Sequence, residues 1–233
     1  DSAASSQKPR QVLDAMTTFY ETSYANIHRG VYDLAERSTE AYEAARETVR
    51  GFVNAGSARE IVFTRNVTAA INTVAYGWGL DNLGPGDLVL ATELEHHSNF
   101  VPWQYIAGRT GAEFTVVPVD AEGELELDAL DGLLERGQPK VLACAAVNNS
   151  LGTILPVPRL VEWAHANGAL VVVDAAQAAP HTPVDVQALG ADFVGFTAHK
   201  LCGPTGIGAL WGRAELLEAM SPFELGGHMI RKV

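Results

Sequence analysis

The chain has 233 residues, 47% of them hydrophobic and 19% charged, so it can bury a sizeable core and is not a disordered polypeptide. Its 16 basic and 28 acidic residues give a net charge of −12, which argues against binding to nucleic acid or to an anionic membrane surface. Two cysteines cannot form a disulfide framework and no apolar run reaches the ~20 residues of a membrane span, so we expect a cytoplasmic protein.

The first part of the chain, to about residue 55, is expected to be helical. Pro9 suits a first helical turn, and the apolar residues between Val12 and Tyr20 fall on one helical face. A second apolar stripe predicts a helix over residues 39–53.

From residue 61 onward, short apolar runs alternate with stretches of helical periodicity. The runs, which predict strands, cover residues 61–63, 88–90, 114–117, 141–143, 170–173, 193–196 and 207–210. The helical stretches cover residues 68–76, 100–110, 127–136 and 159–167. The alternation predicts one α/β domain over residues 1–233, a mostly parallel sheet with helices on both faces. In such sheets the ligand binds at the carboxyl ends of the strands, so polar residues there are the candidates for a site.

Asp174 and Lys200 each follow an apolar run. A carboxylate at the edge of a buried sheet is costly unless a cation or hydrogen-bond donors meet it, and a desolvated lysine can attack a carbonyl to form a Schiff base. Each residue alone is more simply explained, Asp174 as a helix cap and Lys200 as a solvated loop residue. Together, 26 residues apart on successive strand ends, they match pyridoxal 5'-phosphate, which needs a lysine and an acidic partner for its ring nitrogen.

A phosphate group would need its own site, and the strand-to-helix step at residues 61–68 offers one. Thr68 and the adjacent amides would face an anion at the N-terminus of the following helix. Ordinary capping by Asn66 or Thr68 explains the same residues equally well. No glycine-rich nucleotide loop follows a strand, so nucleotide binding is not expected.

Further polar residues follow two other runs. His96 and His97 are adjacent and so do not share a helical face, and no third ligand lies at a suitable interval, so no metal site is expected. A single imidazole beyond a strand end can stack on an aromatic cofactor and relay protons. Asn148 and Asn149 could donate to a cofactor or substrate, although turn residues of this kind are as readily structural.

Over nearly its whole length the sequence resembles the pyridoxal-phosphate-dependent class V aminotransferase family, and within it the cysteine desulfurases of the Suf type. The motifs that carry the resemblance are His28-Arg29-Gly30, Glu95-His96-His97-Ser98-Asn99, Asn149-Ser150-Leu151-Gly152, Asp174-Ala175-Ala176-Gln177, Thr197-Ala198-His199-Lys200 and Gly203-Pro204-Thr205-Gly206-Ile207-Gly208. The implied fold is the large, cofactor-binding domain of a fold-type I enzyme.

The resemblance implies a role for each matching residue. Lys200 would bind the cofactor and move protons at the substrate carbon, and Asp174 would pair with the ring nitrogen. His96 would stack on the ring and take part in proton transfer. The remaining cofactor contacts would come from Gln177 and Asn149 near the phenolic oxygen and from Thr68, Thr197 and His199 at the phosphate. The family often has Thr-Thr-Glu where this chain has residues 67–69 as Val-Thr-Ala, so a weaker affinity for the cofactor is expected.

The implied reaction removes sulfur from L-cysteine, which leaves L-alanine and an enzyme persulfide for an acceptor protein in iron–sulfur cluster assembly. A homodimer is also implied, with residues 226–230 matching a loop near the partner's site. The family's persulfide cysteine and its substrate-binding arginine belong to a smaller C-terminal domain, which we expect to be absent from this sequence. Cys144, in a predicted buried strand, and Cys202, expected to pack under the turn at residues 203–206, are assigned no catalytic role.

Two kinds of alternative stay open. Another class V enzyme, such as a selenocysteine lyase, a kynureninase-like hydrolase or an aminotransferase, would share Asp174 and Lys200. A non-catalytic module that binds pyridoxal phosphate would share them too.

Overall fold

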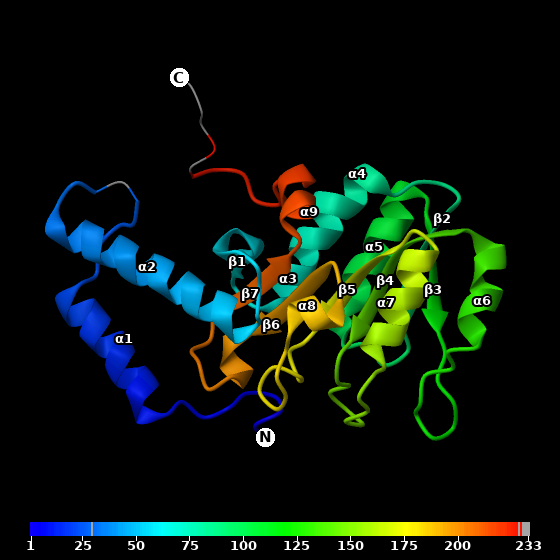
Figure 1. The fold of residues 1–233 in the computed structure, drawn as a ribbon, viewed down its shortest axis with the longest axis horizontal. Coiled ribbons are helices and arrows are strands. Elements are labelled where there is room, and N and C mark those ends of the chain that lie inside the picture. Colours follow the sequence, from blue (N-terminus) through cyan, green and yellow to red (C-terminus); the bar gives the residue numbers. More distant parts are fainter. Residues whose placement is uncertain (29, 228, 230–233) are drawn as a thin grey trace.

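A mostly parallel sheet forms the middle of the computed structural model, which describes residues 1–28, 30–227 and 229 (Figure 1). Within these residues seven strands pair in the order β1-β7-β6-β5-β4-β2-β3. The strands are β1 (Ile61–Thr64), β2 (Asp87–Thr92), β3 (Glu113–Val117), β4 (Gln138–Ala145), β5 (Leu170–Asp174), β6 (Phe193–Thr197) and β7 (Gly208–Gly212). The neighbours from β3 to β6 are parallel, whereas β7 runs antiparallel to both β6 and β1. The predicted α/β fold class is confirmed, and each predicted run contributes to one strand.

The helices follow the predicted order with shifted boundaries. They are α1 (Arg10–Thr22), α2 (Asp33–Phe52), α3 (Val67–Val74), α4 (Leu80–Asn82), α5 (Val101–Thr110), α6 (Ala129–Leu133), α7 (Val157–Ala166), α8 (Val186–Leu189) and α9 (Ala214–Ala219). The helix expected over residues 39–53 begins earlier, at Asp33, and the one expected over residues 127–136 is shorter. The short helices α4, α8 and α9 were not predicted, because three, four and six residues give too little periodicity to detect. No described helix is long and apolar enough to cross a bilayer.

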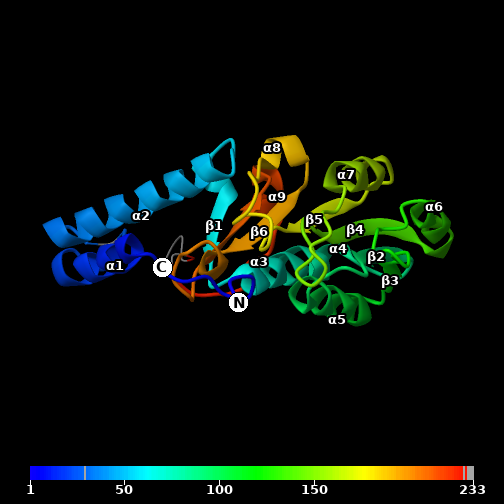
Figure 2. The same ribbon diagram turned by 90° about the horizontal axis from the view of Figure 1, so that it is seen from below.

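Both faces of the sheet are covered, as the edge-on view in Figure 2 shows. Along β5 the side chains alternate between the faces, so Val171 and Val173 join the cluster that contains Leu160 of α7. Val172 joins the opposite cluster, which contains Ile71 of α3. All of these side chains are almost completely buried, which explains why the strands read as continuous apolar runs.

Helices α1 and α2 extend beyond the β1 edge of the sheet (Figure 1). The apolar stripe predicted for α1 is present, but the helix has no buried residue, and Leu13 and Met16 are 40% and 39% exposed. Two of the predicted motifs lie partly outside the described residues. They are residues 28–30, of which Arg29 is not described, and residues 226–230, of which His228 and Ile230 are not described.

A glycine in β6 lets α3 lie directly against the sheet. A Cβ atom on Gly195 would lie 3.2 Å from Cγ2 of Val67 and 3.4 Å from Cβ of Ala70, both in the first turn of α3. The N-terminus of α3 therefore lies beside the strand that leads to Thr197 and Lys200.

Candidate active site

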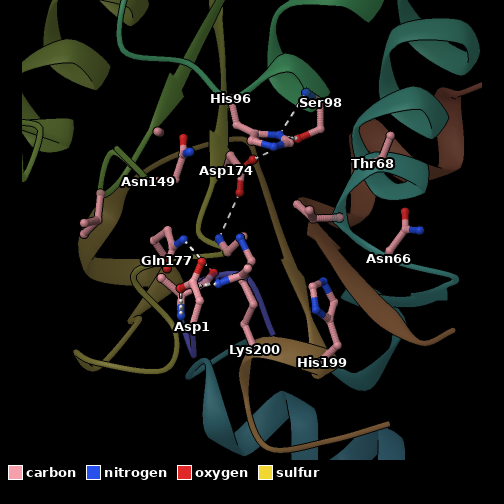
Figure 3. A pocket seen from close by; sticks show the side chains of 16 residues that line it. Asp1, Asn66, Thr68, His96, Ser98, Asn149, Asp174, Gln177, His199 and Lys200 are labelled. Carbon is pink, nitrogen blue, oxygen red and sulfur yellow. Dashed lines mark hydrogen bonds between the residues drawn. The ribbon is translucent and has the colours of Figure 1, made fainter. Parts of the chain in front are cut away.

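A cavity of about 360 Å³ opens at the carboxyl ends of the parallel strands (Figure 3). Its position is the one expected for a ligand site in an open α/β sheet. The predicted site residues that line it are Thr68, His96, Asn149, Asp174, Gln177, His199 and Lys200. Thr197 is the exception, because it is buried beneath the cavity wall with 1% of its surface exposed.

Asp174 and Lys200 enter this cavity from neighbouring parallel strands. Asp174 ends β5 and is 5% exposed, and its Oδ1 accepts the N–H of Ala176 at 2.9 Å. Burial raises the pKa of Asp174, while the Ala176 N–H and the charge of Lys200 act in the opposite direction. Lys200 ends the 3-10 turn Ala198–Lys200 after β6. Burial lowers the pKa of the half-buried Lys200 ammonium, and the charge of Asp174 opposes that shift. Asp174 thus accepts a turn N–H and also faces a lysine, so the capping role does not exclude the functional one.

The N-terminus of α3 forms another wall of the cavity. Asn66 is its capping residue, since Oδ1 of Asn66 accepts the N–H of Ala69 at 2.8 Å. Thr68 is exposed on the cavity side. Capping therefore explains Asn66, and Thr68 is left facing the cavity at the positive end of the helix dipole.

A hydroxyl group beneath the same wall lacks a hydrogen-bond partner in the part of the chain that the structure describes. Oγ1 of Thr197 is buried and forms no hydrogen bond to any described residue, a costly state that an external acceptor would relieve. His199, two residues on, lines the cavity, and its pKa is lowered by burial and by the charges of Lys200 and Lys8. The donors and the positive charge here suit an anionic group.

His96 projects into the cavity from a tight turn after β2. It caps the 3-10 turn His97–Asn99, and its Nδ1 accepts the N–H of Ser98 at 3.1 Å. Oγ of Ser98 lies 2.6 Å from the same Nδ1 and 3.5 Å from Oδ2 of Asp174. His97 lies outside this cavity. No set of three or more potential metal ligands occurs among the residues that the structure describes.

Glu95, which precedes His96, was not predicted as a site residue. Its Oε1 accepts hydrogen bonds from Oγ1 of Thr92 and from the N–H of Ala145, and its Oε2 accepts one from Nδ2 of Asn99, each at 2.6 Å. Burial raises the pKa of Glu95 to about 8, against the effect of these three donors. The carboxyl group joins the His96 turn to the ends of β2 and β4.

The amide side chains differ in what they do. Asn148 is structural, because its Nδ2 donates to the Leu94 carbonyl at 2.6 Å and its Oδ1 accepts two N–H groups of the following turn. Asn149 is exposed at the cavity and bonds only weakly to Ser150, at 3.3 Å. Nε2 of Gln177 donates to the Ala3 carbonyl at 3.0 Å, which makes the first residues of the chain part of the cavity wall.

The two cysteines have opposite environments. Cys144 is completely buried in β4, and burial raises the pKa of its thiol well above the ordinary value. Cys202 is exposed, so the expectation that it packs under the following turn is wrong. Its backbone has φ of 61°, in the left-handed region, and its N–H donates to Oγ of Ser6 at 2.8 Å. This backbone conformation turns the side chain outward instead of under the loop.

Comparison with known proteins agrees with this geometry. The chain is 51% identical to a cysteine desulfurase of Klebsiella pneumoniae over 233 residues, which are 100% of this chain and 57% of that protein. The solved structure of the cysteine desulfurase CsdA from Escherichia coli superposes with a TM-score of 0.90 at 44% identity, over 100% of this chain and 58% of that one. The apo cysteine desulfurase of Thermococcus onnurineus NA1 gives a TM-score of 0.93 at 39% identity, over 100% and 57% of the two chains. The chain thus spans a little over half the length of these relatives.

The match to a family model is more extensive than any local motif. The model for aminotransferase class V covers residues 1–233, and the strand ends that carry Asp174 and Lys200 meet at one cavity within that span. The chain belongs to the class V aminotransferase family.

Proposed function

We propose that this chain binds pyridoxal 5'-phosphate and forms the cofactor-binding part of a cysteine desulfurase. The observation that carries the proposal is the convergence of Asp174 and Lys200 from adjacent strand ends onto one cavity. The N-terminus of α3 at the cavity wall supports a phosphate there, as does the buried Thr197 hydroxyl, which has no hydrogen-bond partner among the described residues. The names of the relatives at about half identity support the choice of L-cysteine as substrate.

The residues present fit this cofactor at each of its polar groups. Asp174 would hold the proton of the ring nitrogen, and Gln177 and Asn149 would donate to the phenolic oxygen. Thr68, Thr197 and His199 would bind the phosphate. Gln177 has one N–H on Ala3, which leaves its second N–H for the ligand.

When bound, pyridoxal phosphate would supply an electron sink for the reacting substrate carbon. Lys200 would be the amine that holds the cofactor, and its Nζ would also take and return a proton. Its lowered pKa favours the unprotonated amine that both tasks require. His96, which lines the same cavity, would stack on the ring and exchange protons with the substrate.

The reaction would convert L-cysteine to L-alanine and pass sulfur through an enzyme persulfide to an acceptor protein. We also propose the homodimer and the place in iron–sulfur cluster assembly, both from the family resemblance. Neither thiol described here fits the persulfide role, because Cys144 is inaccessible and Cys202 belongs to no family motif.

The test of cofactor binding uses the whole chain with added pyridoxal phosphate. We expect a visible absorbance band and, after borohydride reduction and digestion, a covalent label on the peptide that contains Lys200. Lys200→Ala should lose the label, and Lys8→Ala is the matched control, since Lys8 is a nearby lysine that does not line the cavity. A fixed label in the Lys200→Ala protein, or none in the unsubstituted protein, contradicts the proposal.

The reaction is tested separately with L-cysteine. Alanine and sulfide measured in equal amounts, in the presence of a thiol reductant, support the desulfurase. Because neither described thiol fits the persulfide role, labelled protein that releases no alanine fits both a cofactor-binding part that needs a further thiol and a module without catalysis, and only alanine release separates the two.

A further inference from the structure

Ser98 lies between two side chains of the candidate site and was assigned no role. It is 5% exposed, at the turn that follows β2. Its Oγ lies 2.6 Å from Nδ1 of His96 and 3.5 Å from Oδ2 of Asp174, and Figure 3 shows all three side chains at the same wall of the cavity.

The direction of these hydrogen bonds follows from an obligate donor. The backbone N–H of Ser98 can only donate, and it points at Nδ1 of His96 at 3.1 Å. Nδ1 must therefore present its lone pair to Ser98. In the neutral ring the proton is then carried by Nε2.

The serine hydroxyl strengthens the same arrangement. Its single proton has two possible acceptors, Nδ1 of His96 and Oδ2 of Asp174. The contact at 2.6 Å has the length of a strong hydrogen bond, whereas the contact at 3.5 Å lies at the limit of one. The hydroxyl proton consequently favours His96, so two donors from one residue converge on Nδ1.

We infer that Ser98 is a positioning residue that holds His96 in the tautomer protonated at Nε2. His96 then meets whatever occupies the cavity as a hydrogen-bond donor and not as an acceptor. That His96 presents this proton to a cofactor-bound substrate rests on the proposed function, whereas the tautomer itself does not.

The tautomer can be measured in the protein without any ligand. Long-range ¹H–¹⁵N NMR spectra of the histidine-labelled chain distinguish the two neutral forms at about pH 8, where an ordinary imidazole is uncharged. The chain has seven histidines, and the signals of His96 are those lost in His96→Gln. We expect the Nε2–H pattern for His96, and an Nδ1–H pattern overturns the inference.

Two substitutions test the contribution of the hydroxyl. Ser98→Ala removes one donor to Nδ1 and keeps the backbone N–H, so the ratio of Nε2–H to Nδ1–H tautomers should fall about fivefold, the value expected for one hydrogen bond. Ser98→Thr keeps a hydroxyl and should keep the unsubstituted pattern. A ratio that is unchanged in Ser98→Ala overturns the role given to the hydroxyl. If Ser98→Ala does not fold, the pattern of the unsubstituted chain still decides the tautomer.

These outcomes are independent of the proposed function. A chain that binds no pyridoxal phosphate can still show the Nε2–H pattern. A chain that binds it covalently can still show the opposite tautomer.

Discussion

The raised pKa of Glu95 makes the stability of the fold depend on pH. In the unfolded chain this carboxyl group has its ordinary pKa of 4.5, whereas burial in the folded protein raises the pKa to about 8. Between these values the folded state holds one more proton than the unfolded state, so stability falls as the pH rises and levels off above the folded pKa. With those two pKa values, linkage gives a loss of about 3.5 kcal/mol between pH 5 and pH 8 from this group alone.

The test compares the free energy of unfolding in urea at pH 5, 6, 7 and 8 for the unsubstituted chain and for Glu95→Gln. The amide does not titrate, so the substituted chain should lose about 3.5 kcal/mol less stability over this range, even if it is less stable at every pH. Glu93→Gln is the matched control, because Glu93 is an exposed carboxylate two residues away that accepts an N–H at 3.1 Å.

The test depends on how steeply the free energy of unfolding changes with pH, and not on its absolute value. Equal slopes for Glu95→Gln and the unsubstituted chain would refute the reasoning, since they would mean that Glu95 ionises at its ordinary pKa inside the fold. A changed slope in Glu93→Gln would show that the effect belongs to the surface charge of this loop.

Other changes have equally definite outcomes. In the folded protein iodoacetamide should modify Cys202 and spare Cys144, which reacts only in urea, and peptide mass analysis identifies the site. Gly208→Ala should lower the free energy of unfolding in urea by about 2 kcal/mol, because its Cβ would lie 2.7 Å from a carbonyl oxygen of β6. Gly51→Ala in α2, where a Cβ would meet open space, should raise it by about 1 kcal/mol. Asp192→Ala should lower the free energy of unfolding by about 3 kcal/mol in the same assay. The completely buried carboxylate of Asp192 pairs with Arg213, with His165 and with the N–H of Val171. A loss under 1 kcal/mol would contradict its structural role.

The strands could be predicted from the sequence because burial on both faces leaves a continuous apolar run. The direction of β7 could not, since an apolar run carries no information on which way a strand points. A signal was present nonetheless: too few residues separate β6 from β7 to hold a crossover helix, which favours an antiparallel return.

The site was predictable to the extent that its residues follow strands directly. Asp174 and Lys200 stand at strand ends, and the topology rule for open sheets brings such residues together. Ser98 and Glu95 could not be found in this way. The contact of Ser98 with Asp174 spans 76 positions and that of Glu95 with Ala145 spans 50, so both depend on which strands become neighbours. Local sequence shows only a polar turn there.

The beginning of the chain is held at the lysine turn. The carbonyl of His199, next to Lys200, accepts hydrogen bonds from the N–H and from Oγ of Ser6, each at 2.9 Å. Separation of these first residues from the turn would break both bonds at once, so the two segments should open in a single cooperative event. A cleavage near Ser6 would therefore loosen Lys200 itself, so changes made in residues 1–6 do not leave the chemistry of the lysine turn undisturbed.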